Sequence, residues 1–406
     1  MRLSKLLPFK DALLEIDNFQ IKTDLEEIDL KDAHKRVLGE DIYSFHDSPP
    51  FDKSAMDGFA IIAEDSFGAS QNKPKEFKII DKIGAGASSN KTINHNEAIT
   101  IATGSPIPEG ANSVIMKEFT SVDGDNLEVQ SQVTPKENIS PRAEDIKKED
   151  LILKSNSFIR PQEIGLIASA GYSKIKVYKK PKVKILITGN ELVEPTKTLN
   201  KAQIINSNRY ILSALIENCG ALLTYEHVID DFNKTKEAIL NSSKEYDVII
   251  TTGGTALSKG DVVVDAASEV GELKFHGVSI RPGKPAAFAI VNNTPVFMLS
   301  GQPVAAMTQF DMFARKFIMN MQGANFSDKI VKRTSKVKIP STLGRTDYIR
   351  AVSDDESTHH VLNRGSGIIR SMVEANSYII IDENDEGIDE QDEVDILFFD
   401  SMNFNR

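Results

Sequence analysis

The chain has 406 residues, of which 40% are hydrophobic and 26% charged, as expected for a globular protein of two to four domains. Its formal net charge of −11 argues against a nucleic-acid partner, because a large nucleic-acid interface requires a basic patch. No apolar run approaches the roughly 18 residues that cross a membrane, and the N-terminal residues lack the apolar core of a signal peptide. We therefore expect a cytoplasmic protein without a membrane partner.

The chain contains one cysteine, Cys219, so it can form no internal disulfide, which fits a reducing compartment. Cys219 follows Ile211 and Leu215 at four-residue steps, the spacing of one helix face. We therefore expect Cys219 to lie in the core. The alternative, a nucleophilic thiol, lacks a recognisable histidine partner motif.

The N-terminal part of the chain alternates between helical and β patterns. Helical spacing of apolar residues predicts helices at residues 9–16 and 29–38, and a third is expected at 160–171, between Pro161 and Gly171. Turn-separated β-rich runs predict a small β domain over residues 48–138. These runs are residues 58–63, 77–83, 98–102 and 113–117. We group residues 1–47 and 139–180 as an elongated connecting domain of helical and extended segments.

Residues 181–326 alternate strands with helices. Strands are predicted at 183–188, 221–229, 248–252, 273–280, 286–291 and 295–299, and helices at 207–219, 232–246 and 304–320, the first capped by Ser207. Because the strands are almost continuously apolar, we predict a doubly wound, mostly parallel sheet covered on both faces.

Residues 327–406 return to a β pattern, with strands predicted at 331–339, 347–353, 377–381 and 394–399. We expect a C-terminal β-barrel-like domain there. The predicted fold class is therefore multidomain α/β plus β, with small β domains on either side of the central sheet.

The segment 247–261, DVIITTGGTALSKGD, is the strongest candidate for a ligand-binding loop. A strand ends at Thr252, Gly253 and Gly254 follow, and the next helix is expected to begin near Asp261. Open α/β sheets bind ligands beyond the carboxyl ends of their strands, and glycines let the backbone bring N–H groups close to an anion. Asp261 would then bind a metal that bridges phosphates. The alternative is a tight turn without a ligand.

Two further carboxylates follow predicted strands of the same sheet. Glu191 lies in the TGNE loop, and Asp230 ends the strand at 221–229. Both would lie at the same sheet edge as Asp261, so the three could converge on one cation. An N-cap for the next helix is the alternative role of Asp230.

Two later turns have features of an oxyanion site. In SIRPGKPAAF (279–288), Arg281 and Lys284 flank a Pro-Gly turn, and such cations suit a phosphate or a similar oxyanion. The turn LSGQPVAA (299–306) ends a strand and opens a helix. A basic surface turn is the alternative for the first segment.

Two segments of the small β domain combine prolines with polar residues. SPPFDKSAMDGFA (48–60) contains Asp57, and ATGSPIPEGANSVI (102–115) contains Thr103. Generic turn chemistry would explain either segment alone.

Taken together, these segments resemble the molybdopterin molybdenumtransferase family of molybdenum-cofactor biosynthesis, which includes the gephyrin E domain. Any one segment is a weak motif, but the ordered set, spanning about residues 45 to 380, is specific. The matching segments are PPFDKSAMDGFA, ATGSPIPEGA, AEDI (143–146), RPQEIGLIASAG, ITGNEL, VIITTGGTALSKGD, RPGKPAAF, GRTDYIRA (344–351) and SGIIRSMVEAN (366–376).

The resemblance implies an elongated homodimer of four-domain subunits, whose α/β domain binds molybdopterin. Adenylylated molybdopterin and molybdate would be the substrates, and Mg²⁺ or a similar divalent ion the cofactor. The enzyme would cleave the adenylate and insert molybdenum at the dithiolene sulfurs. Other cofactor-assembly proteins are further possible partners.

The resemblance also assigns roles to residues of this chain. Metal and phosphates would be held by Glu191, Asp230 and Asp261. Substrate would be bound by Gly253, Gly254, Ser258, Arg281, Lys284, Pro303, Arg345, Arg350 and Ser371, of which the arginines, the lysine and Ser371 would form the molybdate and phosphate pocket. The catalytic set would be Asp57, Thr103, Asp145, Glu191 and Asp261, the first three reaching the site from the small β domain, in this interpretation that of the partner subunit.

The chain departs from the family pattern at several positions. It has Ala305 where a serine is expected, Arg370 where the family has the first residue of a Ser-Ser pair, Ala143 in place of a glycine, and TALSKG in place of a GGVSxG-like loop. Two readings therefore stay open: a paralogue that prefers tungstate, and one that has lost catalysis.

Another alternative is a nucleotide-pyrophosphate hydrolase of the same pterin-binding superfamily. It would not need PPFDKSAMDG or the C-terminal β domain. A non-catalytic scaffold would need fused domains or partner-binding linkers, and neither is visible.

Overall fold

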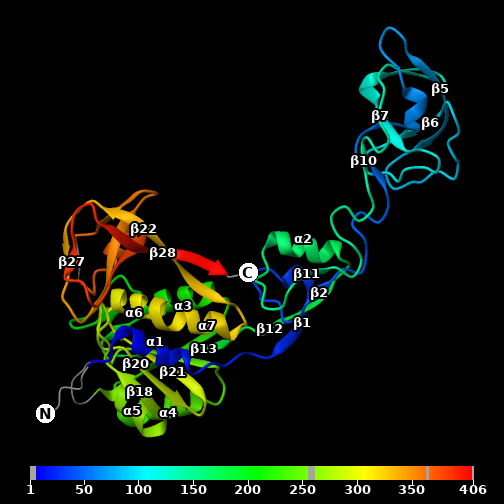
Figure 1. The fold of residues 1–406 in the computed structure, drawn as a ribbon. Coiled ribbons are helices and arrows are strands. Elements are labelled where there is room, and N and C mark those ends of the chain that lie inside the picture. The colour runs from blue at the N-terminus through cyan, green and yellow to red at the C-terminus, as the bar shows by residue number, and fades with distance from the viewer. Residues whose placement is uncertain (1–5, 255–260, 363–364, 405–406) are drawn as a thin grey trace.

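The computed structural model describes residues 6–254, 261–362 and 365–404, the last of these without the side chains beyond 399. The molecule is elongated (Figure 1). The α/β domain and the C-terminal β domain lie together at one end, the small β domain lies at the other, and the connecting domain lies between them. No helix in the described ranges is long and apolar enough to cross a membrane.

The α/β domain is built on a six-stranded sheet of order β16-β13-β17-β21-β20-β18. The first four strands run parallel, and β20 runs against both of its neighbours, so the prediction of a mostly parallel sheet is confirmed. The strands are β13 (Lys182–Thr188), β16 (Leu222–Val228), β17 (Val248–Thr252), β18 (Glu272–His276), β20 (Ala287–Val291) and β21 (Thr294–Leu299).

Helices cover both faces of this sheet, as predicted. Within β13, Ile185 and Ile187 pack into the core beneath one helix layer, whereas Leu186 packs into the core beneath the other. The first layer contains α1 (Phe9–Asp17), α3 (Ser207–Asn218), α6 (Pro303–Gln309), the π-helical turn η4 (Phe310–Ala314) and α7 (Arg315–Met321). The second contains α4 (Phe232–Ser242) and α5 (Val262–Val270).

The N-terminal helix α1 lies against the α/β domain, although its sequence position had suggested a place in the connecting domain. The ring of Phe9 contacts those of Phe313 and Tyr348, with centroids 5.8 and 5.6 Å apart. The amphipathic pattern of α1 correctly predicts that one face is buried, but it does not identify the surface that buries it.

The connecting domain joins two distant stretches of chain. Its strands pair as β1 with β12 and β2 with β11, and α2 packs beside them. The helix predicted at 29–38 is wrong, because this stretch contributes to β1 and to a short 3₁₀ turn, η1. The elements are β1 (Leu25–Asp29), η1 (Leu30–Asp32), β2 (Ile42–Tyr43), β11 (Leu151–Leu153), α2 (Pro161–Ser169) and β12 (Lys174–Tyr178).

The small β domain contains a six-stranded sheet of order β7-β4-β6-β5-β9-β8. The β-rich runs of the sequence form four of these strands, as predicted. The elements are β3 (Lys53–Ser54), β4 (Gly58–Ile61), η2 (Ala63–Ser66), β5 (Lys75–Ile83), β6 (Glu97–Ile101), β7 (Ser113–Met116), η3 (Lys117–Phe119), β8 (Thr120–Asp123), β9 (Asn126–Val129) and β10 (Ile139–Ser140), which pairs with β3.

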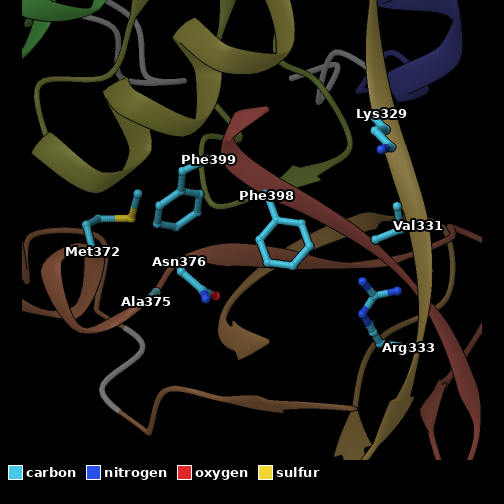
Figure 2. A pocket seen from close by; sticks show the side chains of 8 residues that line it. All are labelled: Lys329, Val331, Arg333, Met372, Ala375, Asn376, Phe398 and Phe399. Carbon is cyan, nitrogen blue, oxygen red and sulfur yellow. The ribbon is translucent and has the colours of Figure 1, made fainter. Parts of the chain in front are cut away.

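The C-terminal domain is a closed sheet, because β24 pairs with both β25 and β26. Strand β19, from the Arg281 turn, pairs with β24 and so joins this domain to the α/β domain. Figure 2 shows a hollow on its surface between β22, β28 and α8, lined by Val331, Phe398 and Met372 among others. The elements are β19 (Ile280–Arg281), β22 (Phe326–Ser335), β23 (Ile339–Pro340), β24 (Thr346–Ser353), β25 (Ser357–His360), α8 (Arg370–Glu374), β26 (Ser377–Ile381), β27 (Gly387–Ile388) and β28 (Glu393–Phe404).

Candidate functional site

A cavity lies at the carboxyl ends of the parallel strands, the edge at which open α/β sheets bind ligands. Strands β13, β17 and β21 are neighbours in register, so Thr188, Thr252 and Leu299 end at the same edge. The cavity has a volume of about 110 Å³. Its lining residues are Ile187, Thr188, Glu191, Leu192, Ile204, Ile205, Asn206, Ser207, Asn208, Thr252, Gly253, Gly301 and Pro303. Three of these residues, Glu191, Gly253 and Pro303, are among those that the sequence predicts at the site.

The glycine pair after β17 is required by local geometry. Gly253 and Gly254 have φ angles of 95° and 60°, in the left-handed region that favours glycine. A Cβ on Gly253 would lie 2.4 Å from the carbonyl oxygen of Thr188. The backbone of this loop therefore packs directly on the end of β13 and leaves the cavity lined partly by main chain.

Asn208 joins two loops of the cavity, and sequence reasoning missed it. Its Nδ2 donates to Thr252 Oγ1 and to the carbonyl oxygen of Gly301, both at 2.9 Å. Thr252 Oγ1 in turn donates to the carbonyl oxygen of Ser300 at 2.9 Å. A polar residue in the first turn of an amphipathic helix was the available signal.

The cap of helix α3 also differs from the prediction. Asn206, rather than Ser207, occupies the N-cap position, and its Oδ1 accepts from the backbone N–H of Arg209 at 3.2 Å. The cluster Asn-Ser-Asn offers several capping residues, and the sequence pattern does not distinguish them.

Three buried polar atoms at this sheet edge have no hydrogen-bond partner among the described residues. They are Thr188 Oγ1, Asn208 Oδ1 and Asp261 Oδ2. Buried polar groups without partners are costly, at about 1–3 kcal/mol each, and are uncommon in folded proteins. Their presence at the predicted ligand-binding edge indicates a site that receives polar groups of a ligand.

Asp261 begins helix α5, close to the position expected from the sequence. Its Oδ1 caps the helix by accepting from the backbone N–H of Val264 at 3.2 Å. Burial raises the pKa of Asp261 to about 6, and hydrogen bonds from the helix N–H groups oppose that rise. The side chain is therefore a buried carboxylate, and among the described residues the start of helix α5 offsets its charge.

The other two predicted metal ligands lie in neighbouring loops and are exposed. Asp230 Oδ2 accepts from the backbone N–H of Asn190 at 3.2 Å, and Asn190 Oδ1 accepts from that of Asp230 at 3.2 Å. Glu191 lies next to this pair and lines the cavity. Within the described ranges, no three acidic, histidine or cysteine side chains are grouped closely enough to hold a metal. Ser258 and the TALSKG segment lie outside the described residues.

A buried glutamine, Gln309, joins the two turns that were predicted to bind oxyanions. Its Oε1 accepts from the backbone N–H of Ser300, and its Nε2 donates to the carbonyl oxygen of Gly283, both at 2.6 Å. Gly283 lies between Arg281 and Lys284, whose side chain is exposed. Gln309 therefore fixes the basic turn against the cavity edge. Its helical position among apolar residues gave little sign of this role.

The predicted arginines form two groups rather than one. Arg281 donates to Asp347 Oδ2, and Arg345 Nε donates to Asp347 Oδ1 at 2.8 Å. Asp347 is fully buried and also accepts from Ser341 Oγ at 2.6 Å. Sequence reasoning missed Asp347, although it lies two residues after Arg345 in the GRTD segment.

Arg350 and Ser371 form the second group. Arg350 Nη1 donates to Ser371 Oγ at 2.6 Å, so these two predicted residues are in contact. The segment before α8 also reaches the start of α6, because the carbonyl oxygen of Ser366 accepts from the backbone N–H of Val304 at 3.0 Å. The second group is thereby tied to the turn that carries Pro303.

In the small β domain, Asp57 and Thr103 are in direct contact. The backbone N–H and Oγ1 of Thr103 both donate to Asp57 Oδ1 at 2.8 Å, and Lys117 Nζ lies 3.8 Å from Asp57 Oδ2. These contacts lower the pKa of Asp57, and the hydrogen bond from the Thr103 backbone contributes most. Asp145 is exposed on the strap 141–146, whose backbone bonds to Ser48. In Figure 1 this domain stands away from the α/β domain of the same chain.

Models of known families match most of the chain. The MoeA N-terminal region (domain I and II) matches residues 7–171, a domain described as a "probable molybdopterin binding domain" matches residues 184–320, and the MoeA C-terminal region (domain IV) matches residues 332–399.

Individual relatives agree with these matches. A Methanocaldococcus jannaschii protein named for molybdopterin biosynthesis is 40% identical, with 92% of each chain covered. A molybdopterin molybdenumtransferase of Staphylococcus aureus is 34% identical over 97% of this chain and 96% of its own. The crystal structure of a molybdopterin biosynthesis MoeA protein from Pyrococcus horikoshii is 34% identical and superposes with a TM-score of 0.84, covering 97% of this chain and all of that chain.

Proposed function

Because this chain belongs to the MoeA family of molybdopterin biosynthesis proteins, we propose that it is a molybdopterin molybdenumtransferase. In this reaction the adenylate of adenylylated molybdopterin is cleaved, and the dithiolene sulfurs take up molybdenum from molybdate. The observation that carries the proposal is the cavity at the sheet edge, where Thr188 and Asn208 each contribute a buried polar atom without a partner among the described residues. The full-length domain match favours this function over a nucleotide-pyrophosphate hydrolase, which would not need the outer β domains.

The residues of this chain would bind and orient the substrates. Gly253 and Gly254 would let the backbone approach the pterin end of the substrate. Arg281 and Arg345, held in place by Asp347, would present guanidinium groups to an oxyanion, because planar N–H donors match oxyanion geometry. This grouping places positive charge next to the turn that Gln309 fixes.

Asp261 fits the role of a ligand to a divalent cation. Its Oδ2 is buried and without a partner in the described structure, and carboxylate oxygens are the ligands that Mg²⁺ prefers. Mg²⁺ is commonly held by one or two carboxylates together with substrate phosphates, so a preformed three-carboxylate group is not required. Glu191 and Asp230 would approach from the adjacent loops. When bound, Mg²⁺ would neutralise charge on the pyrophosphate linkage.

We further propose a homodimer whose active site is shared between subunits. Asp57 and Thr103 lie on the small β domain, which stands far along the molecule from the sheet edge of its own chain (Figure 1), and Asp145 lies on the segment 141–146, whose backbone bonds to Ser48 at the start of that domain. A second copy would bring them to that edge. The lowered pKa of Asp57 would keep this carboxylate ionised at neutral pH. A cytoplasmic location and contacts with other cofactor-assembly proteins complete the proposal.

The proposal is tested by incubating purified full-length protein with adenylylated molybdopterin, Mg²⁺ and either molybdate or tungstate, and measuring AMP release by chromatography. We expect AMP release to require both Mg²⁺ and the oxyanion, and the two oxyanions compared side by side give the preference. Intact substrate under all conditions would contradict the transferase. AMP release without any oxyanion would instead favour the hydrolase.

A pair of lysine variants tests the predicted oxyanion turn. We expect Lys284→Ala to raise the molybdate concentration for half-maximal AMP release, because Lys284 is the exposed cation of that turn. Lys244→Ala is the matched control, since Lys244 lies after α4, near the amino end of β17 and away from the cavity. Equal effects of the two substitutions would remove Lys284 from the site.

A further inference from the structure

The side-chain amide of Asn208 has only one orientation that satisfies its neighbours. Nδ2 faces two acceptors, the carbonyl oxygen of Gly301 and Thr252 Oγ1, and the Thr252 hydroxyl hydrogen is already donated to Ser300. A reversed amide would place Oδ1 against the carbonyl oxygen of Gly301. The amide is therefore held with both N–H groups used and with Oδ1 left over.

This oxygen is a buried hydrogen-bond acceptor, held in place on a residue that lines the cavity. Asn208 is 7% exposed, it lines the cavity, and its Oδ1 has no partner in the described structure. Thr188 Oγ1, also without a partner there, lines the same cavity. A fixed acceptor attracts N–H groups and repels the oxygen atoms of phosphate or molybdate.

The rest of the lining also suits an uncharged ring. Apolar surface is supplied by Ile187, Leu192, Ile204, Ile205 and Pro303. The charged residue among those that line the cavity in the described ranges, Glu191, is a carboxylate that also attracts N–H groups. At about 110 Å³ the cavity is much smaller than the roughly 300–1,000 Å³ of a pocket that encloses a whole small-molecule ligand, so it suits one end of a substrate rather than the whole of it.

We infer that Asn208 Oδ1 accepts a hydrogen bond from the 2-amino group of the pterin, which makes Asn208 a residue that selects and orients the substrate. The inference rests on the proposed function, because that function supplies the pterin. It also gives the substrate a direction: the pterin edge lies against Asn208, whereas the phosphates and the oxyanion lie outside this part of the cavity.

The test compares two fluorescent probes, pterin and lumazine, which differ in carrying an amino group or a carbonyl oxygen at position 2. Each is titrated into the full-length protein, and binding is followed by fluorescence. We expect pterin to bind at least about tenfold more tightly, because lumazine would set an oxygen against a buried acceptor. In Asn208→Leu the preference should fall to about one.

A control separates loss of the acceptor from loosening of the loops. Thr252→Val removes one partner of the Asn208 amide but leaves Gly301 to hold it, so both probes should weaken equally and the preference should remain. Thermal denaturation checks that each variant is folded, and Asn208→Ala replaces Asn208→Leu if the latter is not.

Two results would overturn the inference: wild-type protein that binds both probes equally or binds neither, or a preference that survives in the Asn208 variants. Failure of the proposed function gives a different result. If the protein prefers pterin through Asn208 but releases no AMP, the transferase is contradicted, whereas the contact between Asn208 and the pterin is supported.

Discussion

Replacing Asp261 by asparagine tests the buried carboxylate at the start of α5. The asparagine oxygen can still cap the helix by accepting from Val264, so the local fold should survive. In the metal-free wild type, burial raises the pKa of Asp261 from 3.8 to about 6. Because the protonated Asp261 side chain is favoured in the folded state, it contributes to the free energy of unfolding. This contribution is fully present below pH 3.8 and is lost as the pH rises through about 6.

The size of this effect follows from the two pKa values. Between pH 5 and pH 8 the wild type should lose about 1.4 kcal/mol of stability that the variant, which cannot titrate, keeps. For the α/β domain, which has about 150 residues, this loss of stability corresponds to a fall of roughly 3–6 °C in melting temperature. The measurement is calorimetric melting of both proteins at pH 5 and pH 8 in EDTA. Parallel pH dependence of the two proteins would refute the reasoning.

The same pair of proteins reports on the metal. Added Mg²⁺ should raise the melting temperature of the wild type at pH 8, because a ligand that binds only the folded state stabilises it. Asp261→Asn should show little of that rise and should release AMP much more slowly. An equal rise in both proteins would place the cation elsewhere.

Three further predictions concern Gly253, Asp347 and Cys219. Gly253→Ala should lower the free energy of unfolding by at least about 1–3 kcal/mol in thermal denaturation, because its Cβ would meet the Thr188 carbonyl. Gly124→Ala, also at positive φ but in open space, should lower it less, and equal losses would contradict the close packing. Asp347→Asn should raise the molybdate concentration for half-maximal AMP release roughly tenfold, because it weakens the buried charge-assisted contact that holds Arg281 and Arg345. An unchanged concentration would show that these two arginines do not bind the oxyanion. Burial raises the pKa of Cys219 to about 12, so the native thiol should resist iodoacetamide at pH 8 and Cys219→Ala should keep AMP release; rapid labelling with loss of activity would revive the nucleophile.

Features that depend on short stretches of sequence were predictable. The strands and helices of the α/β domain follow directly from apolar periodicity, and the glycine pair after Thr252 identified the loop at the sheet edge. Cys219 is buried in the core, as its helical spacing predicted. In each case a local pattern determines the structure, because the burial of a face or the freedom of a glycine needs no knowledge of distant residues.

Features that depend on tertiary partners were not predictable. The helix predicted at 29–38 does not form because both ends of this stretch pair with segments far along the chain. Asp29 belongs to β1, which pairs with β12, and Val37 and Leu38 form bridges to Phe158 and Val177. Asn208, Gln309 and Asp347 act through loops that only the fold brings to them. A polar residue within an apolar pattern shows that a partner is needed, but it does not show which one.

The structure shows where two of the positions that depart from the family pattern lie. Ala305 is buried in α6, next to the turn that carries Pro303, and Arg370 pairs with Glu374 at the surface of α8. Ser371, the retained serine, is the one that contacts Arg350. The contact between Arg350 and Ser371 therefore does not depend on the residue at position 370.

In the proposed dimer the small β domain of one chain completes the sheet edge of the other. This arrangement is tested most directly by combining two variants, Asp57→Asn and Asp261→Asn, each expected to release little AMP alone. When the subunits exchange at random, half of the dimers are mixed. Each mixed dimer has one site with both native residues and one site with neither, so about a quarter of wild-type activity should return. A mixture as inactive as its components would contradict the shared site.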